Sequence, residues 1–479
     1  MCKTRKVWLK GELGSSQNRL FAEALDAVLW EPGSEDNWDA IWHTSMPAAE
    51  LFADAPAGGW VNHIPGNNHL TVKSALHKTV NVAMARWETN APFLPETYNL
   101  PAESALLRRA AVHSPDQAWV LKPANGARGE GIRLLDTLDD LPATGDWVVQ
   151  RYLDSPHLYH GRKYVLRLYV LISAVDPLRI WRFTEGSVKL ASLPYNPEER
   201  ENPYVFLTNP DVNERNAEVG VEFLSLADYS AWLRAQGHES AILFDQIDDL
   251  IVQTVMAGCE AMRARTASVA ASSGCAYELI GLDCLVDTQL KPWLLECNLS
   301  PSLDVCARAD QGGVAEAAMK KALIDDLVGL LGFNEPDLPS ACPLQRQADE
   351  MARSGRYRCL YPSADAVAQF HQLIAPSLRD QQAMERVSGK LVTPSYEPWR
   401  VTESIENNQL FLTSQNTGER YVPNDTASWI WLQMSAGAGP EEVAAQVATE
   451  ATLPRVRAEV WQTLQSWSRQ GLIRQKMTI

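Results

Sequence analysis

The chain lacks several features that mark common protein classes. Its 479 residues include eight cysteines, but no two of them form a CxxC pair, so neither a zinc site nor a disulfide framework is expected. No apolar run is long enough to span a bilayer, and the N-terminus has no long apolar segment. Internal repeats and low-complexity tracts are absent as well. We therefore expect a globular, cytoplasmic protein of a reducing compartment, with no membrane partner.

Positive charge is also scarce. The chain has 43 lysine and arginine residues against 59 aspartate and glutamate residues, which gives a formal net charge of −16. Such an excess of negative charge disfavours nonspecific binding to nucleic acid or to anionic membranes, so we expect no nucleic-acid partner. A basic peptide partner remains compatible with this charge. The length predicts roughly two to four domains.

Changes in composition divide the chain into four parts. The proline-rich stretch Leu94–Pro101 closes a small α/β lobe, residues 1–100. A larger unit is expected over 101–340. Residues 341–389 are rich in proline, serine, alanine and charge, and we interpret them as a helical tail and linker. A separate small domain is expected over 390–479.

The small domain has the pattern of a winged helix. Three short strands are predicted at Trp399–Glu403, Gln409–Thr413 and Arg420–Val422, and three helices at 425–435, 441–449 and 453–470. Its tryptophans are expected in a core of its own. It has no basic stripe, so DNA binding is a poor interpretation of this domain.

A β-hairpin is predicted near the middle of the chain, where two apolar runs flank a polar turn. The runs are Tyr277–Val286 and Pro292–Cys297. If Gln289–Leu290 is a two-residue loop, Asp283 lies directly opposite Glu296. Because side chains alternate between the two faces of a strand, one face then carries both carboxylates.

Asn298 shares that face. Two carboxylates and an amide oxygen are costly on an otherwise apolar hairpin unless something cationic pairs with them, and such hard oxygen ligands suit Mg²⁺. The alternative is a surface hairpin with scattered acids, which the apolar flanks disfavour.

A glycine-rich loop follows the buried strand Trp119–Lys122. The sequence PANGARGEGIRLL places Arg128 among three glycines, which are Gly126, Gly129 and Gly131. Glycines let a loop approach a phosphate closely with its N–H groups, and Lys122 at the entrance adds a point charge. The spacing is neither a Walker A loop nor a dinucleotide fingerprint. We favour a strand–turn–strand hairpin over a nucleotide, with a plain tight turn as the alternative.

Cations recur on the strands that follow. Strand Trp147–Leu153 ends at a natural hinge, and strand Lys163–Ile172 carries Lys163, Val165 and Arg167 on one face. Two cations on one face of a central strand favour a polyphosphate ligand over solvent exposure on an edge strand. Lys73 and Lys78, on a predicted helix, could face a ligand, but we favour the interpretation that they are solvated lysines.

Residues 60–305 resemble the tubulin–tyrosine ligase-like family of ATP-grasp ligases. The stretches that carry the resemblance include VNHIPGNNHLTVKSAL, WVLKPANGARGEGI, GRKYVLRLYVLISAVDPLRIW and YELIGLDCLVDTQLKPWLLECNLSPSL. The resemblance implies an α+β ATP-grasp fold, with 101–340 as its central and C-terminal lobes and with ATP and Mg²⁺ as cofactors. By position, Asp283, Glu296 and Asn298 resemble the magnesium ligands.

The resemblance also implies roles for other residues. The catalytic set would be Lys163, Arg167 and Glu296. Nucleotide contacts would come from Lys122, Arg128, Gly129, Gly131, Lys163 and the hinge residues Gln150, Arg151, Tyr152 and Leu153. Substrate contacts would come from Lys189, Thr208 and Asn209. The chain departs from the family in having Val165 where an aspartate is usual and Lys189 where an arginine is usual.

Residues 390–475 resemble the PqqD-like domain, a recognition element for precursor peptides, through ERYVPNDTASWIW and the closing GLI. That family binds a leader peptide as an added strand at its sheet edge. Together the resemblances imply an ATP-dependent carboxylate–amine ligase that adds a free amino acid to a ribosomally made precursor peptide through an acyl phosphate. Two alternatives stay open. One is a ligase acting on a folded protein tail, and the other is a non-catalytic peptide-binding scaffold with a decayed ATP site.

Overall fold

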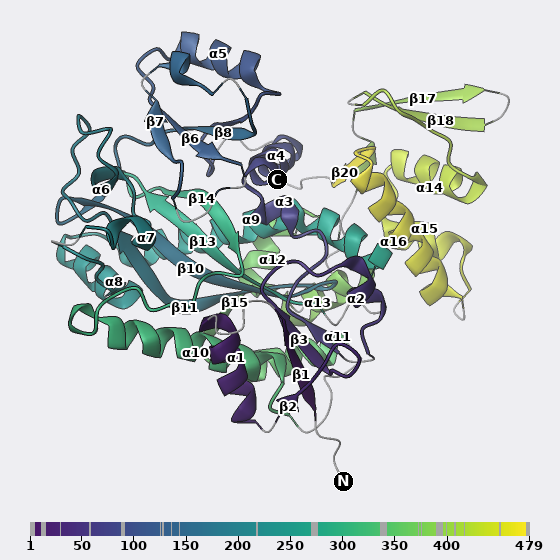
Figure 1. Cartoon of the computed structure of the whole chain (residues 1–479). Coiled ribbons are helices and arrows are strands. Elements are labelled where there is room, and N and C mark those ends of the chain that lie inside the picture. Colours follow the sequence, from purple (N-terminus) through teal and green to yellow (C-terminus); the bar gives the residue numbers. More distant parts are fainter. Residues whose placement is uncertain are drawn as a thin grey trace.

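The computed structural model describes most of the chain. The described residues are 5–10, 16–28, 30–56, 59–87, 92–124, 126, 129–135, 137–142, 144–216, 219–269, 276–335, 343–371, 373–374, 376–388, 396–398, 400–406, 409–415, 417–449 and 452–475. Figure 1 shows a large mixed lobe at the centre, a smaller lobe around α5 above it and a C-terminal domain at one side. In none of these residues does a helix combine the length and apolar character needed to cross a bilayer.

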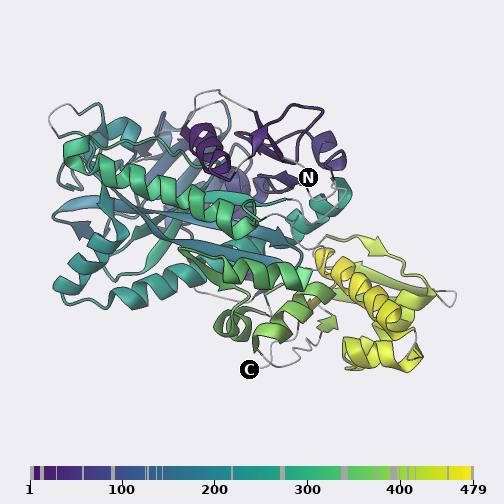
Figure 2. The same cartoon turned by 90° about the horizontal axis from the view of Figure 1, so that it is seen from below.

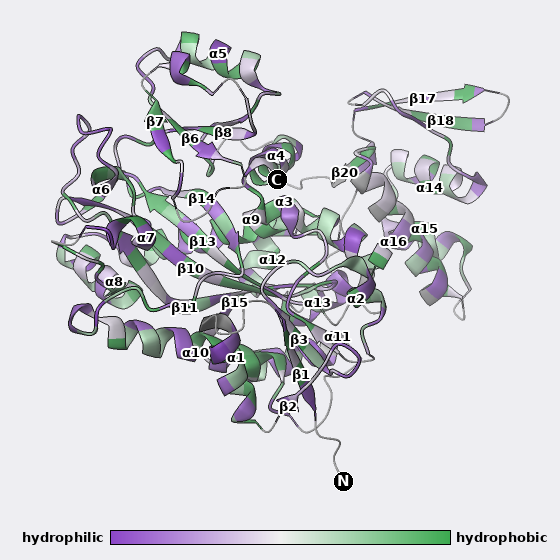
Figure 3. Cartoon of the chain, in the orientation of Figure 1, coloured by the Kyte–Doolittle hydropathy of each residue, from purple (hydrophilic) through white to green (hydrophobic). Residues whose placement is uncertain are grey.

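A seven-stranded sheet organises the large lobe. Its main order is β12-β11-β10-β13-β14, with β9 paired to β10 and β15 paired to β11. The bounds are β9 (Leu158–Tyr159), β10 (Arg162–Val175), β11 (Leu178–Leu190), β12 (Leu224–Ser225), β13 (Glu278–Val286), β14 (Pro292–Leu299) and β15 (Tyr357–Tyr361). β10 is therefore a central strand, as predicted for Lys163–Ile172 rather than the edge-strand alternative. In Figure 3 hydrophobic colour follows β13 and its neighbours.

Alternation along β10 builds two cores. Leu168 and Val170 belong to a cluster with α9 (Ser240–Val269), whereas Tyr169 and Leu171 belong to a cluster with α10 (Gly313–Leu331). Successive side chains of a strand point to opposite faces, so one helix covers each face of the sheet. The long helices before and after the hairpin, α9 and α10, are thus the two layers that bury it.

The N-terminal lobe is a small parallel sheet with order β2-β1-β3-β4. Its elements are β1 (Lys6–Lys10), α1 (Ser16–Asp26), β2 (Glu31–Pro32), β3 (Ala40–His43), α2 (Ala49–Ala53), β4 (Trp60–Val61), α3 (Asn68–Thr71) and α4 (Lys73–Arg86). Phe21 and Trp42 pack with Phe333, which follows α10, so this sheet shares a core with the large lobe.

The smaller lobe is an antiparallel sheet with order β5-β8-β6-β7. Its elements are β5 (Thr97–Leu100), α5 (Ser104–His113), β6 (Trp119–Pro123), β7 (Arg133–Leu135) and β8 (Trp147–Arg151). The pairing of Trp119 with Leu135 confirms the predicted hairpin around the glycine-rich loop. Three short helices follow β11 in the chain. They are α6 (Pro203–Phe206), α7 (Pro210–Asn213) and α8 (Leu226–Ala235).

The central hairpin has the predicted pairing but not the predicted loop. Asp283 lies opposite Glu296, as expected. The two-residue loop is wrong, because Asp287 N donates to Lys291 O at 3.1 Å and encloses three residues, Thr288 to Leu290. An irregularity after Asp283, where Cys284 pairs with Leu294, leaves Leu295 as an extra residue. This bulge shifts the register by one and restores the predicted pair.

Residues 343–388 are more than the expected helical tail and linker. They form α11 (Pro343–Ala352), β15, α12 (Ala364–Phe370) and α13 (Leu378–Ser388), and β15 extends the large sheet at β11. Glu350 on α11 binds Arg179 on β11 through two hydrogen bonds of 2.7 and 2.9 Å. The polar composition that suggested a linker therefore includes side chains that pair with buried arginines.

The C-terminal domain stands beside the large lobe in Figures 1 and 2. Its strands are β16 (Tyr396–Pro398), β17 (Val401–Glu406), β18 (Gln409–Ser414), β19 (Arg420–Tyr421) and β20 (Ile473–Gln475), and its helices are α14 (Asp425–Ser435), α15 (Pro440–Val447) and α16 (Leu453–Arg469). β17, β18 and β19 form one sheet, and β16 pairs with β20. Trp431, Trp461 and Trp467 are buried in a separate core, as expected.

We expect Glu350→Ala to lower the free energy of unfolding by about 3–5 kcal/mol, because it leaves a buried guanidinium without its carboxylate. Arg179 and Glu350 are each 1% exposed. Urea denaturation followed by tryptophan fluorescence measures the change. Glu185→Ala is the matched control, since Glu185 forms a solvent-exposed pair with Arg356 and should cost less than about 1 kcal/mol. Equal losses of stability in the two variants would contradict the stabilising role given to the buried Arg179–Glu350 pair.

Candidate active site

A cavity of about 770 Å³ lies between the smaller lobe and the large sheet. This volume suits a small-molecule ligand. Most of the predicted site residues line it, namely Lys122, Gly129, Gln150, Arg151, Tyr152, Leu153, Lys163, Arg167, Lys189, Thr208, Asn209, Asp283, Glu296 and Asn298. Gly131 is exposed and is not among the residues that line the cavity, and Arg128 lies outside the described residues. Sequence reasoning missed Tyr169, Phe206, Ser302, Asp304, Glu316 and Lys320, which also line the cavity.

Asp283 is the most strongly paired acid of the site. It lies on β13 opposite Arg167 of β10, whose Nε and Nη2 donate to its two oxygens at 2.6 and 3.0 Å. Lys189 of β11 donates to the same two oxygens at 3.1 and 3.0 Å. Burial alone would raise the pKa of Asp283, but the two cations outweigh it and hold the pKa well below its usual range. The carboxylate is therefore ionised.

Lys73 contacts the second acid and corrects one prediction. Its Nζ lies 3.6 Å from Glu296 Oε2 and donates to the carbonyl oxygen of Gly126 at 2.7 Å. The interpretation of Lys73 as a solvated helix lysine is therefore wrong, whereas Lys78 is exposed as expected. The signal that could have found Lys73 is its place as the first residue of α4, directly after Val72, the residue that caps the end of α3.

Asn298 completes the oxygen-bearing face of the hairpin. Its Nδ2 donates to the carbonyl oxygen of Gly281 at 3.1 Å and lies 3.4 Å from Asp283 Oδ2. Among the described residues, no cluster of three His, Cys, Asp or Glu side chains could hold a metal by itself. Two carboxylates and one amide oxygen fit Mg²⁺, which normally takes its remaining ligands from water and phosphate oxygens. These residues stay the predicted magnesium ligands.

Two further lysines that line the cavity are Lys122 and Lys163. Lys122 Nζ donates to Gln150 Oε1 at 2.8 Å, and Lys163 Nζ donates to the Tyr152 hydroxyl at 3.2 Å and lies 4.4 Å from the centre of that ring. Burial, together with the charge of Lys122, lowers the pKa of Lys163 to about 7. Burial also lowers the pKa of Lys122. Both ammonium groups bond neutral oxygen atoms, so an anionic ligand would restore their charge balance.

Two residues of the glycine-rich loop, Gly126 and Gly129, line the cavity. Gly129 has φ +79°, and a Cβ atom there would meet Val212 Cγ2 at 3.0 Å. A side chain at this position would therefore be both strained and crowded. Since Lys73 holds the carbonyl of Gly126, the loop is tied to the helix that also contacts Glu296.

Residues 53–337, more than half of the chain, match the family model described as the tubulin-tyrosine ligase family. The chain belongs to the tubulin-tyrosine ligase family. This confirms the predicted resemblance over the ligase part, and with it a mixed α+β, ATP-grasp-like fold. Ligases of the tubulin-tyrosine ligase family use ATP, generally with Mg²⁺.

Several curated relatives are similar to this chain. Human tubulin monoglutamylase TTLL4 is 32% identical over 331 residues, which is 64% of this chain and 26% of that protein. Mouse tubulin polyglutamylase TTLL13 is 28% identical over 374 residues, 74% of this chain and 45% of that protein. Human tubulin polyglutamylase TTLL7 is 27% identical over 414 residues, 81% of this chain and 46% of that protein. The chain thus spans about a quarter to a half of these relatives' length.

The family match ends before the C-terminal domain begins. The resemblance of residues 390–475 to a PqqD-like domain therefore stays a prediction.

The low pKa of Lys163 predicts that binding of a nucleotide in this cavity depends on pH. Because its pKa is about 7 in the free protein and a polyphosphate favours the ammonium form, we expect ATP binding to take up protons and to weaken as pH rises above 7. Calorimetry in buffers of different ionisation enthalpy measures the uptake. Lys163→Arg keeps the charge at all working pH values, so the uptake due to this residue should disappear. Equal uptake by the wild type and Lys163→Arg would contradict the prediction.

Proposed function

We propose that this protein is an ATP-dependent carboxylate–amine ligase that joins an amino acid to a carboxylate of a polypeptide. The observation that carries the proposal is the convergence of Asp283 and Glu296 on one cavity with several cations, among them Lys73, Lys122, Lys163, Arg167 and Lys189. A site with this charge pattern can bind a polyphosphate and hold a divalent ion against it. Membership of a ligase family supports the same chemistry.

The reaction needs two steps. A carboxylate oxygen of the acceptor attacks the terminal phosphorus of ATP, and ADP leaves with the electrons of the broken P–O bond. The amine of the amino acid then attacks the carbonyl carbon of the acyl phosphate. Phosphate leaves, and the amine loses a proton to give the amide. Activation is required because a free carboxylate has no good leaving group.

The chain's own residues supply charge and position. Lys122 and Lys163, which line the cavity, would bind phosphate oxygens, and Arg167 and Lys189 would neutralise the charge that develops during transfer. Asp283, Glu296 and Asn298 would hold Mg²⁺, which when bound screens the charge on the phosphates. The loop around Gly129 packs against Val212 and Asn209 beside the cavity, and this contact would help to keep water from the acyl phosphate.

Glutamate is the first amino acid to test, and a protein tail is the better supported acceptor. The relatives' names describe tubulin glutamylases. Acceptance of an acidic tail would depend on the cations of the cavity, because a net charge of −16 gives no long-range attraction to such a tail.

A precursor peptide is the second candidate acceptor, and one observation favours it. β17 lies at an edge of the three-stranded sheet in the C-terminal domain, with β18 on its other side. An edge strand offers unpaired backbone groups to which an extended peptide can add as a further strand. The third alternative, a non-catalytic scaffold, accounts poorly for a cavity in which both predicted metal-binding carboxylates are in place.

The decisive experiment supplies ATP, Mg²⁺ and a mixture of amino acids together with one acceptor at a time. An acidic peptide that represents a tubulin tail tests the first candidate, and a peptide encoded beside the gene tests the second. Mass spectrometry should show an acceptor heavier by one amino-acid residue, with ADP formed in equal amount. Failure to form ADP and to change the mass of either acceptor would overturn the proposal.

Glu296→Gln should reduce turnover by at least about a hundredfold, because it replaces an anionic oxygen ligand for Mg²⁺ with a neutral amide while keeping the side-chain shape. Peptide binding to residues 390–475, followed by fluorescence anisotropy on the whole chain, should not change. Glu185→Gln is the control, since it alters an exposed carboxylate on β11 outside the cavity. Wild-type turnover in Glu296→Gln would show that the metal assignment is wrong.

A further inference from the structure

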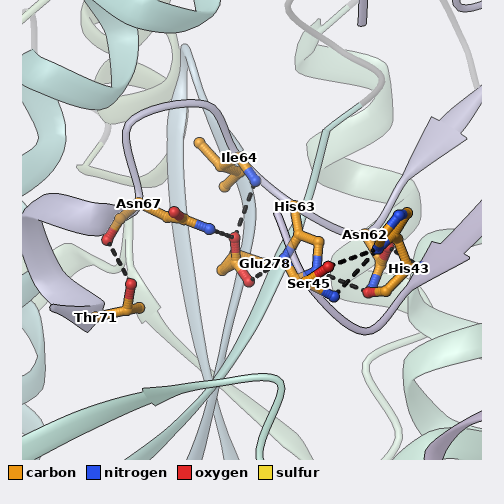
Figure 4. A network of polar contacts seen from close by, with 8 residues as sticks. All are labelled: His43, Ser45, Asn62, His63, Ile64, Asn67, Thr71 and Glu278. Carbon is orange, nitrogen blue, oxygen red and sulfur yellow. Dashed lines mark hydrogen bonds and ion pairs between the residues drawn. The ribbon is translucent and has the colours of Figure 1, made fainter. Parts of the chain in front are cut away.

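A buried polar network joins the loop before α3 to the first residue of β13 (Figure 4). Glu278 accepts three hydrogen bonds. His63 Nδ1 lies 2.9 Å from Oε1, while Ile64 N and Asn67 Nδ2 donate to Oε2 at 2.9 and 2.7 Å. His63 and Glu278 side chains are each 1% exposed. Both carboxylate oxygens are therefore satisfied from a single loop.

The geometry favours a positive charge on His63. Its Nε2 lies 2.7 Å from the carbonyl oxygen of His43, so both ring nitrogens face acceptors. A neutral imidazole has one N–H group, and only the imidazolium has two. Burial alone would lower the pKa of His63, but Glu278 outweighs it and raises the pKa above its usual value.

The neighbouring histidine is in the opposite state. His43 Nδ1 accepts from Ser45 N at 3.1 Å, which needs an unprotonated nitrogen. Burial, Lys10 and His63 together lower the pKa of His43. The titratable groups that face His63 are Glu278 from β13 and His43 from β3, while Tyr277 of β13 interacts with Glu278 and Lys10 of β1 with His43.

The network connects two parts of the active site. On one side, the loop leads through α3 into α4, whose first residue is Lys73. On the other side, β13 carries Asp283 five residues after Glu278. Val61 bridges Ala276, and its carbonyl oxygen accepts from Tyr277 N at 3.0 Å, so the backbone holds the same junction.

We propose that His63 and Glu278 are positioning residues for the active site, whose buried ion pair sets the placement of Lys73 on α4 relative to Asp283 on β13. Neither residue lines the cavity, so neither is a catalytic residue. A buried ion pair is weak evidence for stability in general, because apolar residues of similar volume often stabilise a core as well. What the pair adds here is a fixed orientation, since four polar contacts hold the ring of His63 and the carboxylate of Glu278.

The charge on His63 gives the pair a defined pH dependence. A histidine whose pKa is raised on folding stabilises the fold below its unfolded value, about 6.5, and the stabilisation is lost as pH rises through the folded value. Loss of the proton leaves one ring nitrogen facing an oxygen acceptor with no hydrogen between them. We therefore expect the His63–Glu278 contact to hold α4 less firmly in the same pH range.

His63→Gln and Glu278→Gln test the proposal in the whole chain. We expect either variant to lower kcat by about ten- to a hundredfold, with a smaller effect on the KM for ATP, because small misplacements of reacting groups cost that much. In the wild type, we expect activity to fall as His63 loses its proton at higher pH. This part of the pH dependence should be absent in His63→Gln. The double variant should be no worse than the poorer single variant, because the two residues act as one unit.

His69→Gln, on α3 and outside the network, is the matched control. If the Gln variants fail to fold, Asn67→Ser removes one donor to Glu278 and leaves the ion pair, and a smaller loss of kcat is expected. Folded His63→Gln with wild-type kcat and pH profile would overturn the proposal.

The kinetic readouts rest on the proposed function, so two further measurements are independent of it. ATP affinity from calorimetry and hydrogen exchange of α4 require no ligase activity. In His63→Gln, we expect weaker ATP binding and faster exchange at the start of α4. If both stay at wild-type values, the positioning role is wrong. If both change while the wild type forms no product, the proposed function fails and the positioning role stands.

Discussion

The burial of the Asp283 carboxylate beside two cations is the interaction on which the site depends. Removing such an ion from water costs several kcal/mol unless partners of good geometry compensate it. Arg167 supplies a two-point contact from β10 and Lys189 a second cation from β11, so three adjacent strands must keep their register to neutralise one group. A polyphosphate would bring negative charge for these cations, and a divalent ion positive charge for the acid. Every charge could then change partner without being left unpaired.

The two departures from the family pattern are neighbours in the sheet. Val165 and Lys189 are cross-strand partners in the β10–β11 pair. An aspartate at position 165 would lie directly across from position 189, at the distance where opposite charges attract. With valine there, the Lys189 ammonium reaches Asp283 instead. Valine at position 165 thus offers Lys189 no carboxylate on its cross-strand partner, and Lys189 serves Asp283 as a second cation that helps to lower its pKa.

Local sequence pattern predicted the features that depend on neighbouring residues. Alternation along Lys163–Ile172 correctly placed its cations on one face, and apolar flanks correctly identified the hairpin that pairs Asp283 with Glu296. The Leu295 bulge was missed because a bulge adds one residue without changing the apolar pattern. The contact of Lys73 with Glu296 was not predicted, because helix periodicity does not show whether a long polar side chain points to solvent or to another lobe. The strand β15 was missed because its partner β11 is far away in the sequence.

The two ends of α4 meet two different parts of the molecule. Lys73 at its start contacts Glu296 in the cavity, and Arg86 at its end pairs with Glu260 of α9 at 3.0 Å and donates to Ser468 of α16. Ser468 also donates to Glu260 at 3.3 Å, so a residue of the C-terminal domain joins an ion pair of the ligase lobe. A helix of 14 residues is a stiff connection about 20 Å long. The C-terminal domain, which lies outside the family match, is therefore fixed to the helix that supplies a cation to the active site.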